Sequence, residues 1–264
     1  MSNLNDKIRI HSIVGHFGSG KTEFAVNYVL DLRKVYDKVA ILDMDIANPY
    51  FRSRERQSLM IENDIDIHFN TYGYDINEDL PAITATVRAP LENKDYVTVV
   101  DVGGNDSGAR IINQFRKYFL DEDSRMLAVV NLNRPDTETV ELAIEQIKSI
   151  ETETGIKIDG IINNTHMLRE TTTEDILYGY EKCRETGKLL GIPVVYSTCV
   201  REMLPALLED AKMAGIETHV VDISNGIDAK SAAEREEPSA QNIMNIYPIT
   251  LQMRPSWLDI EATR

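Results

Sequence analysis

The sequence has few cysteines and no long apolar run. Only Cys183 and Cys199 occur among 264 residues, and they form neither a CxxC nor a CxC pair. Reduced thiols in a cytoplasmic protein are therefore expected, rather than a disulfide-built secreted fold. Residues 1–6 are polar, and no stretch of about 18 apolar residues is present, so we expect neither a signal peptide nor a membrane-spanning segment.

Positive charge is also scarce. The formal net charge is −15 at pH 7, and no dense run of Lys and Arg appears. This balance argues against nucleic acid or an anionic membrane surface as a partner, because both are bound through phosphates. Apolar residues make up 42% of the chain, which is enough to build a sizeable core.

The most informative stretch is Gly15–Thr22, which reads GHFGSGKT and fits the phosphate-binding pattern G-x-x-x-x-G-K-[ST]. Apolar residues precede it and a helical pattern follows it, which is the context that this motif requires. Backbone N–H groups of such a loop surround phosphate oxygens, Lys21 reaches the β- and γ-phosphates, and the Thr22 hydroxyl binds Mg²⁺. The plainer alternative is a glycine-rich turn. The predicted nucleotide-binding residues are Gly15, His16, Phe17, Gly18, Ser19, Gly20, Lys21 and Thr22.

Short apolar runs alternate with helical patterns along the rest of the chain. Strands are predicted at 7–14, 39–42, 96–100, 126–130, 158–162, 194–196 and 218–221. Helices are predicted at 21–35, 82–93 and 108–119, from a cap at Asp136 or Thr137 to 153, from a cap at 171–173 to 190, and at 201–213. This order predicts a doubly wound α/β fold, with a mostly parallel sheet and helices on both faces.

The alternating pattern covers residues 1–223, which we expect to form a nucleotide-binding domain. Residues 224–264 are expected to be a linker and an extended tail that packs on this domain or on a partner. Residues 64–81 mix turn formers with scattered hydrophobics, so an irregular excursion is expected there.

Acidic residues follow two of the predicted strands. Asp101 comes after four apolar residues and precedes Gly103 and Gly104, so it is placed to hold the Mg²⁺ site while a glycine N–H contacts a γ-phosphate. Asp43 and Asp45 end the preceding strand, where one supports the metal and Asp45 orients an attacking water. An ordinary turn or a helix cap is the structural alternative for each of these residues.

These segments resemble the MinD/ParA/CobQ superfamily of P-loop proteins, within the SIMIBI class. The resemblance rests on the glycine loop, on Ile41–Ile46 and on Val99–Gly104, and it covers residues 7 to about 222. It implies that Asp45 aligns the hydrolytic water and that Asp43 lies beside magnesium. It also implies that Asn164 reads the base, that the segment starting at Ser197 lines the other side of the base, and that the protein acts with a protein partner or as a homodimer.

The loop departs from the pattern of that superfamily, which places a lysine where this chain has His16. An imidazole does not supply a permanent positive charge at pH 7, so His16 either hydrogen-bonds a phosphate or packs. The candidate arginines to replace this charge are Arg52, Arg54 and Arg110. The C-terminal residues also lack the basic amphipathic helix of the MinD branch, and the two cysteines do not suit the shared metal site of the metal-handling branch.

ATP is expected rather than GTP. A common GTP-binding pattern, Asn-Lys-x-Asp, is missing at 131–134 and at 164–167, both of which lack the aspartate. The function that follows is an ATP-binding protein, a Mg²⁺-dependent ATPase that forms ADP and phosphate and acts as a switch for a protein partner. The alternative is a small-molecule kinase or ATP-dependent ligase of the dethiobiotin synthetase or CobQ type, with His68, Tyr72 and Tyr74 in an acceptor pocket. A third possibility is a module that binds nucleotide without hydrolysing it.

Overall fold

The computed structural model describes residues 8–44, 57–69, 87–104, 112–223 and 242–252. Within these residues, nine strands form one sheet in the order β3-β2-β4-β1-β5-β6-β7-β9-β8. Every neighbouring pair is parallel. The strands are β1 (Ile10–Gly15), β2 (Val39–Met44), β3 (Asp66–Phe69), β4 (Val97–Val102), β5 (Ser124–Val130), β6 (Gly160–Asn163), β7 (Val194–Val200), β8 (Glu217–Val220) and β9 (Ile243–Ile249).

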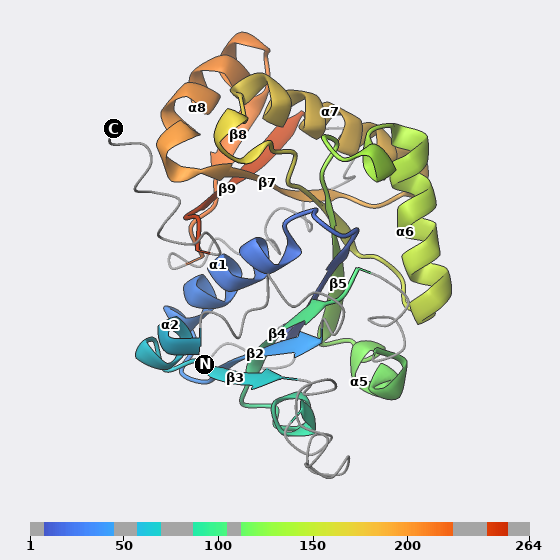
Figure 1. Ribbon diagram of the computed structural model, residues 1–264, viewed down its shortest axis with the longest axis vertical. Helices are drawn as coiled ribbons and strands as arrows, with labels where there is room; N and C mark the ends of the chain where they lie inside the picture. The colour runs from blue at the N-terminus through green and yellow to red at the C-terminus, as the bar shows by residue number, and fades with distance from the viewer. Residues whose placement is uncertain (1–7, 45–56, 70–86, 105–111, 224–241, 253–264) are drawn as a thin grey trace.

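Helices cover both faces of the sheet, as Figure 1 shows. The α-helices are α1 (Lys21–Arg33), α2 (Gln57–Glu62), α5 (Arg116–Phe119), α6 (Val140–Thr154), α7 (Thr173–Leu190) and α8 (Leu204–Met213), with a further helical stretch at 87–92. One core cluster joins the sheet to α1 and α2, and two others join it to the remaining helices. The prediction of a three-layer α/β/α fold is therefore confirmed, because the short apolar strands are buried on both faces.

Two helix starts illustrate how local sequence sets the elements. Thr172 caps α7 with a capping box, in which its hydroxyl accepts from the Asp175 N–H while the Asp175 carboxylate accepts from the Thr172 N–H. The predicted cap of α6 at Asp136 or Thr137 is wrong, because Thr139 caps this helix. A short 3₁₀ turn, η3 (Pro135–Thr137), occupies the expected start, since proline at its first position favours a tight turn there.

The largest difference from the sequence-based prediction is β9. We expected the sheet to end before residue 224, yet Ile243–Ile249 lies between β7 and β8 and pairs with both. Its side chains alternate between the two faces, so that Tyr247 joins the α1 side and Met244 the α8 side. The part of the chain after 223 thus contributes a buried strand to the sheet.

The residues that end β9 hold α1 through a stripe of polar side chains, Glu23, Asn27 and Asp31, spaced four residues apart. The Asn27 amide donates to the Thr250 carbonyl at 2.9 Å and accepts from the Thr250 N–H at 2.8 Å. The Tyr247 hydroxyl donates to Asp31 at 2.7 Å. Burial of Tyr247 and the neighbouring Asp31 carboxylate raise its pKa well above the ordinary value. The helix that follows the glycine loop is therefore fixed to the last strand.

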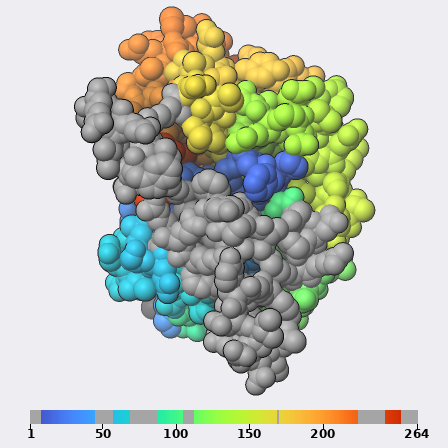
Figure 2. Space-filling view, in the orientation of Figure 1, coloured from blue at the N-terminus to red at the C-terminus, as the bar shows by residue number. Residues whose placement is uncertain are grey.

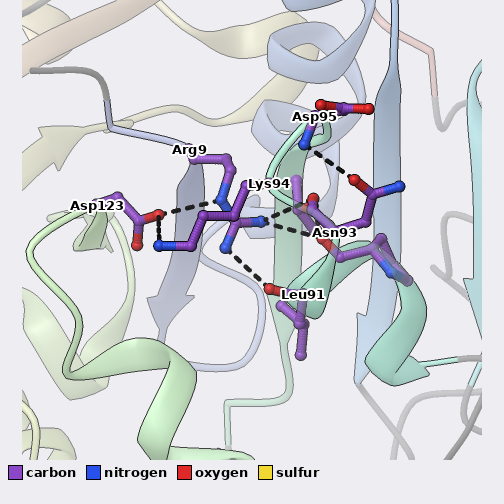
Figure 3. A network of polar contacts seen from close by, with 8 residues as sticks. Arg9, Leu91, Asn93, Lys94, Asp95 and Asp123 are labelled. Atoms are coloured by element: carbon purple, nitrogen blue, oxygen red, sulfur yellow. Dashed lines mark hydrogen bonds and ion pairs between the residues drawn. The ribbon is translucent and has the colours of Figure 1, made fainter. Parts of the chain in front are cut away.

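A second polar network, centred on Arg9, fixes the start of β1, at the end of the strand away from the glycine loop. Arg9 is 7% exposed and donates to Asp123 and to the Leu91 carbonyl, as drawn in Figure 3. It also donates to the Pro90 carbonyl. These carbonyls end the helical stretch at 87–92, where a cation is favourable. Arg9 thus ties that helix and the start of β5 to the strand that leads into the glycine loop.

The edge of the sheet differs from the expectation for 64–81. Asp66–Phe69 is regular strand β3, parallel to β2, rather than part of an irregular excursion. His68 pairs in register with Leu42, and burial lowers the pKa of its imidazole. Tyr72 and Tyr74, the other residues of the predicted acceptor pocket, lie outside the described residues.

Candidate functional site

The glycine loop leaves the sheet at its centre. β1 ends at Gly15 and α1 begins at Lys21, and Gly18 and Gly20 between them have φ of 74° and 88°. These left-handed conformations suit glycine because they need no Cβ. A Cβ on Gly15 would lie 2.4 Å from the Val129 carbonyl oxygen, so the loop packs closely on the neighbouring strand. In Figure 2, blue atoms of the β1–α1 region reach the surface beside the green and yellow ones.

Lys21 is held inside this loop. Its ammonium donates to the His16 carbonyl at 3.1 Å, and the residue is only 6% exposed. The Lys21 ammonium thus lies within the loop, and its contact with phosphate oxygens stays a prediction.

Thr22, in the first turn of α1, contacts Asp101 near the end of β4. The Thr22 hydroxyl donates to the Asp101 carboxylate at 2.7 Å. Asp101 is fully buried, and Asp43 pairs with it in register on the adjacent strand β2. Mg²⁺ in phosphate-binding sites uses one or two carboxylates together with phosphate oxygens, so one hydroxyl and two carboxylates at the loop fit a magnesium site.

The glycines that follow β4 also lie against the loop. A Cβ on Gly104 would lie 2.6 Å from the Gly15 carbonyl oxygen and 2.8 Å from the Phe17 nitrogen. Only glycine allows the backbones to approach so closely. Gly104 is thus next to the loop, and the role of Gly103 or Gly104 at a γ-phosphate stays a prediction.

Asn164 supports the loop from the end of β6. Its amide donates to the Ser19 carbonyl at 2.6 Å, and its carbonyl oxygen accepts from the Thr198 hydroxyl at the end of β7. A Cβ on Gly20 would lie 2.2 Å from the same amide nitrogen. The structure therefore gives Asn164 a contact with the loop backbone, and its predicted role as a base reader stays a prediction.

Ser197 is buried one position before Thr198. Its hydroxyl accepts from the Asn163 amide at 3.2 Å, within a polar layer at the ends of β6 and β7. The segment that it begins lies beside Asn164, as the resemblance implies, and contact with a base stays a prediction.

His16 and Phe17 form the outer part of the loop. The His16 side chain is one-third exposed, with its Nδ1 atom 3.6 Å from the Asp136 carboxylate and 3.1 Å from the Phe17 carbonyl oxygen. The Phe17 residue is 62% exposed. Contact with Asp136 is a third option for His16, besides the phosphate bond or packing expected from sequence.

Arg134 was missed by the analysis of the sequence. Arg134 lies in the loop after β5 and is exposed. Its Nε donates to the Gly18 carbonyl at a distance of 3.0 Å. The three arginines that we named, Arg52, Arg54 and Arg110, lie outside the described residues. The Asn-Arg-Pro sequence at 133–135 was a visible signal, because a rigid turn at a strand end is a typical place for a binding residue.

His166 lies beside this arginine and beneath the loop. Its Nε2 would be 3.2 Å from a Cβ on Gly20. Burial, and then the charge of Arg134, lower the pKa of His166 to about 4. The imidazole is therefore neutral at pH 7.

Three further predictions concern Asp45, the two cysteines and membrane-spanning segments. Asp45, assigned to the attacking water, lies outside the described residues. Cys183 and Cys199 are both buried, and burial raises the pKa of Cys199 to about 12. Across the described part of the chain, no helix combines the length and the apolar character that a membrane span needs.

Comparisons with known proteins give only distant likenesses. No family model and no curated protein matches the chain. Similar solved structures include chloroplast FtsY from Physcomitrella patens, with a TM-score of 0.49 and 16% identity over 74% of this chain and 62% of that one. FtsY from Mycoplasma mycoides has a TM-score of 0.43 and 20% identity over 72% of this chain and 60% of that one. The signal recognition particle receptor FtsY from Elizabethkingia anophelis, in complex with GDP, has a TM-score of 0.43 and 16% identity over 69% of this chain and 56% of that one.

The chain thus spans about three-fifths of the length of these FtsY structures. The fold assignment rests on the chain itself, with the glycine loop after a central parallel strand and an acidic strand end beside it. This is the P-loop NTPase fold, and the assignment to the SIMIBI class stays a prediction. The finer assignment to the MinD/ParA/CobQ branch stays a prediction.

Proposed function

We propose that this protein binds and hydrolyses a nucleoside triphosphate with Mg²⁺ and acts as a nucleotide-driven switch. The observation that supports this most is the hydrogen bond of 2.7 Å between Thr22 and Asp101, directly at the start of the helix that follows the glycine loop. The hydroxyl and the carboxylate are the pair that a phosphate-bound magnesium requires.

Each residue near the loop has a role in this proposal. The loop N–H groups and Lys21 bind the phosphates, and Thr22, Asp43 and Asp101 hold Mg²⁺, which supplies positive charge at the transferring phosphoryl group. Asp45 orients the attacking water. The segments after Asp43 and Asp101 order around the γ-phosphate and relax after hydrolysis, which is how a switch signals to a protein partner or a second copy of the chain.

ATP is the proposed nucleotide. The turn after β6 carries Met167 where a common guanine-reading pattern has an aspartate. The FtsY structure from Elizabethkingia anophelis contains GDP, so GTP is the nucleotide to compare with ATP. The kinase or ligase alternative gains no support, since Tyr72 and Tyr74 of its acceptor pocket lie outside the described part of the chain and His68 lies in β3.

Calorimetric titration of the purified chain with ATP and with GTP, each with and without Mg²⁺, tests this proposal. ATP is expected to bind, and Mg²⁺ is expected to strengthen binding in the wild type. Thr22→Ala and Asp101→Asn should lose most of the effect of Mg²⁺, whereas Thr152→Ala, an exposed threonine that donates to a backbone carbonyl in α6, should behave as wild type. Absence of binding of any triphosphate at millimolar concentration would overturn the proposal.

Release of phosphate tests the hydrolytic step separately. Asp45→Asn is expected to retain ATP binding and to lose hydrolysis, because an amide does not take a proton from water. Unchanged hydrolysis in this variant would reject the role of Asp45 while leaving nucleotide binding intact.

A further inference from the structure

Two successive carbonyl groups show which way the glycine loop faces. The Gly18 carbonyl accepts from Arg134 after β5, and the Ser19 carbonyl accepts from Asn164 after β6. The backbone thus turns these two carbonyls outward toward β5 and β6, while the Ser19 N–H donates to the His16 carbonyl at 3.1 Å within the loop. A phosphate would then bind on the opposite side of the loop. Arg134 therefore lies on the rim of the loop rather than over the phosphates.

The sheet order fixes the direction of a bound triphosphate. β1 lies between β4, which carries Asp101, and β5, which leads to Arg134. Thr22 and Asp101 would hold Mg²⁺ close to the terminal phosphates of a bound nucleotide, so these phosphates would lie on the β4 side. The nucleoside end then leaves the loop on the β5 and β6 side, where the guanidinium is.

The turn that carries Arg134 is rigid. The Asn131 side-chain oxygen accepts from the N–H groups of Asn133 and His166, and the Asn131 carbonyl accepts from the Thr137 hydroxyl at 2.5 Å. Asn131 is fully buried beneath the turn. The Arg134 Nε donates to the Gly18 carbonyl, which fixes one edge of the guanidinium, and the residue is exposed. We therefore expect the planar face of the guanidinium to be accessible to a ligand at a fixed position beside the loop.

We propose that Arg134 binds the nucleoside by stacking its guanidinium face on the base. This inference rests on the proposed function, because it needs a nucleotide in the loop. A guanidinium stacks on any aromatic ring, so Arg134 contributes affinity for the base of ATP and of GTP alike and does not choose between them. A Lys in its place keeps the charge and the donor to Gly18 but has no planar face.

Binding of ATP, GTP and tripolyphosphate, each with Mg²⁺, tests this assignment in the full chain. Arg134→Gln and Arg134→Lys are both expected to raise the Kd for ATP and GTP about tenfold, and to change the Kd for tripolyphosphate less than twofold. The matched control is Arg116→Gln, which removes another exposed arginine that donates to a glycine carbonyl, that of Gly155 at 2.9 Å.

Three results would overturn the inference. An equal loss of affinity for tripolyphosphate in Arg134→Gln would show that Arg134 acts on the phosphates or on loop shape. Full recovery by Arg134→Lys would show that charge alone matters. Unchanged ATP and GTP affinity in both variants would show no contact with the base. If the wild type binds none of the three ligands, the proposed function itself fails, which is a separate result.

Discussion

The Asn164 amide donates to the Ser19 carbonyl at 2.6 Å and so joins the end of β6 to the glycine loop across 145 residues of sequence. The same side chain accepts from the Thr198 hydroxyl. One buried amide thus connects the end of β6, the glycine loop before α1, and β7. The shape of the phosphate-binding loop depends on residues far from it in sequence.

Removal of this amide is expected to weaken nucleotide binding. Asn164→Ala leaves the Ser19 carbonyl and the Thr198 hydroxyl without this partner, a loss of about 1–3 kcal/mol, so the Kd for Mg²⁺–ATP should rise about tenfold or more in calorimetric titration. Asn164→Asp should lose a similar amount, because a carboxylate cannot donate to the carbonyl. Asn113→Ala, which removes an exposed amide that donates to the Glu153 carbonyl, should bind as wild type, and a normal Kd in Asn164→Ala would contradict the prediction.

A side chain at Gly104 is expected to displace the loop. The added Cβ would meet the backbone of Gly15 and Phe17 at 2.6 and 2.8 Å, and backbone atoms cannot move aside as a flexible side chain does. Gly104→Ala should therefore lower ATP affinity at least tenfold. The control is Gly215→Ala, which has φ of 70° and no atom near its Cβ. It should reduce stability by about 1 kcal/mol without changing affinity, and equal affinities in the two variants would reject the argument.

His166 makes stability depend on pH between about 4 and 6.5. Its pKa is lowered to about 4 in the folded protein by burial and by Arg134, from an ordinary value of 6.5. The unfolded chain therefore binds a proton that the folded chain excludes, so this contribution to stability is full above pH 6.5 and is lost as pH falls toward 4. Between pH 7 and 5 the loss is about 2 kcal/mol.

Urea unfolding at pH 7 and at pH 5 measures this loss. His166→Asn has no group that titrates in this range, so its free energy of unfolding should fall about 2 kcal/mol less than that of the wild type between the two pH values. The same pH dependence in both proteins would show that His166 is not the source.

The contact between α1 and the end of β9 is expected to stabilise the whole fold. Asn27 is 7% exposed and makes two hydrogen bonds with the backbone of Thr250. Asn27→Ala leaves both backbone groups unsatisfied and should lower the free energy of unfolding by about 2 kcal/mol. Lys38→Ala, which breaks the exposed ion pair with Asp95, should change it by less than about 0.5 kcal/mol. A loss in Asn27→Ala no larger than that of the control would argue against this role of β9.

The sequence alone was sufficient for the loop and for the layers of the fold. Gly15–Thr22, Asp43 and Asp101 are read from local order, because an apolar run followed by glycine or aspartate specifies a buried strand and its end. Short strands that alternate with helices also determine a parallel sheet with helices on both faces. The positions of these candidate site residues therefore follow from neighbours in the sequence.

Only the tertiary structure decided what surrounds the loop. β9 was missed because seven residues after a linker-like stretch show no periodicity that distinguishes a buried strand from an extended tail. Its place between β7 and β8 depends on pairing with strands distant in the sequence. Arg134 and Asn164 reach the loop over 116 and 145 residues. Such contacts form because strand ends converge at one edge of the sheet, and no local pattern in the chain records which of them will meet.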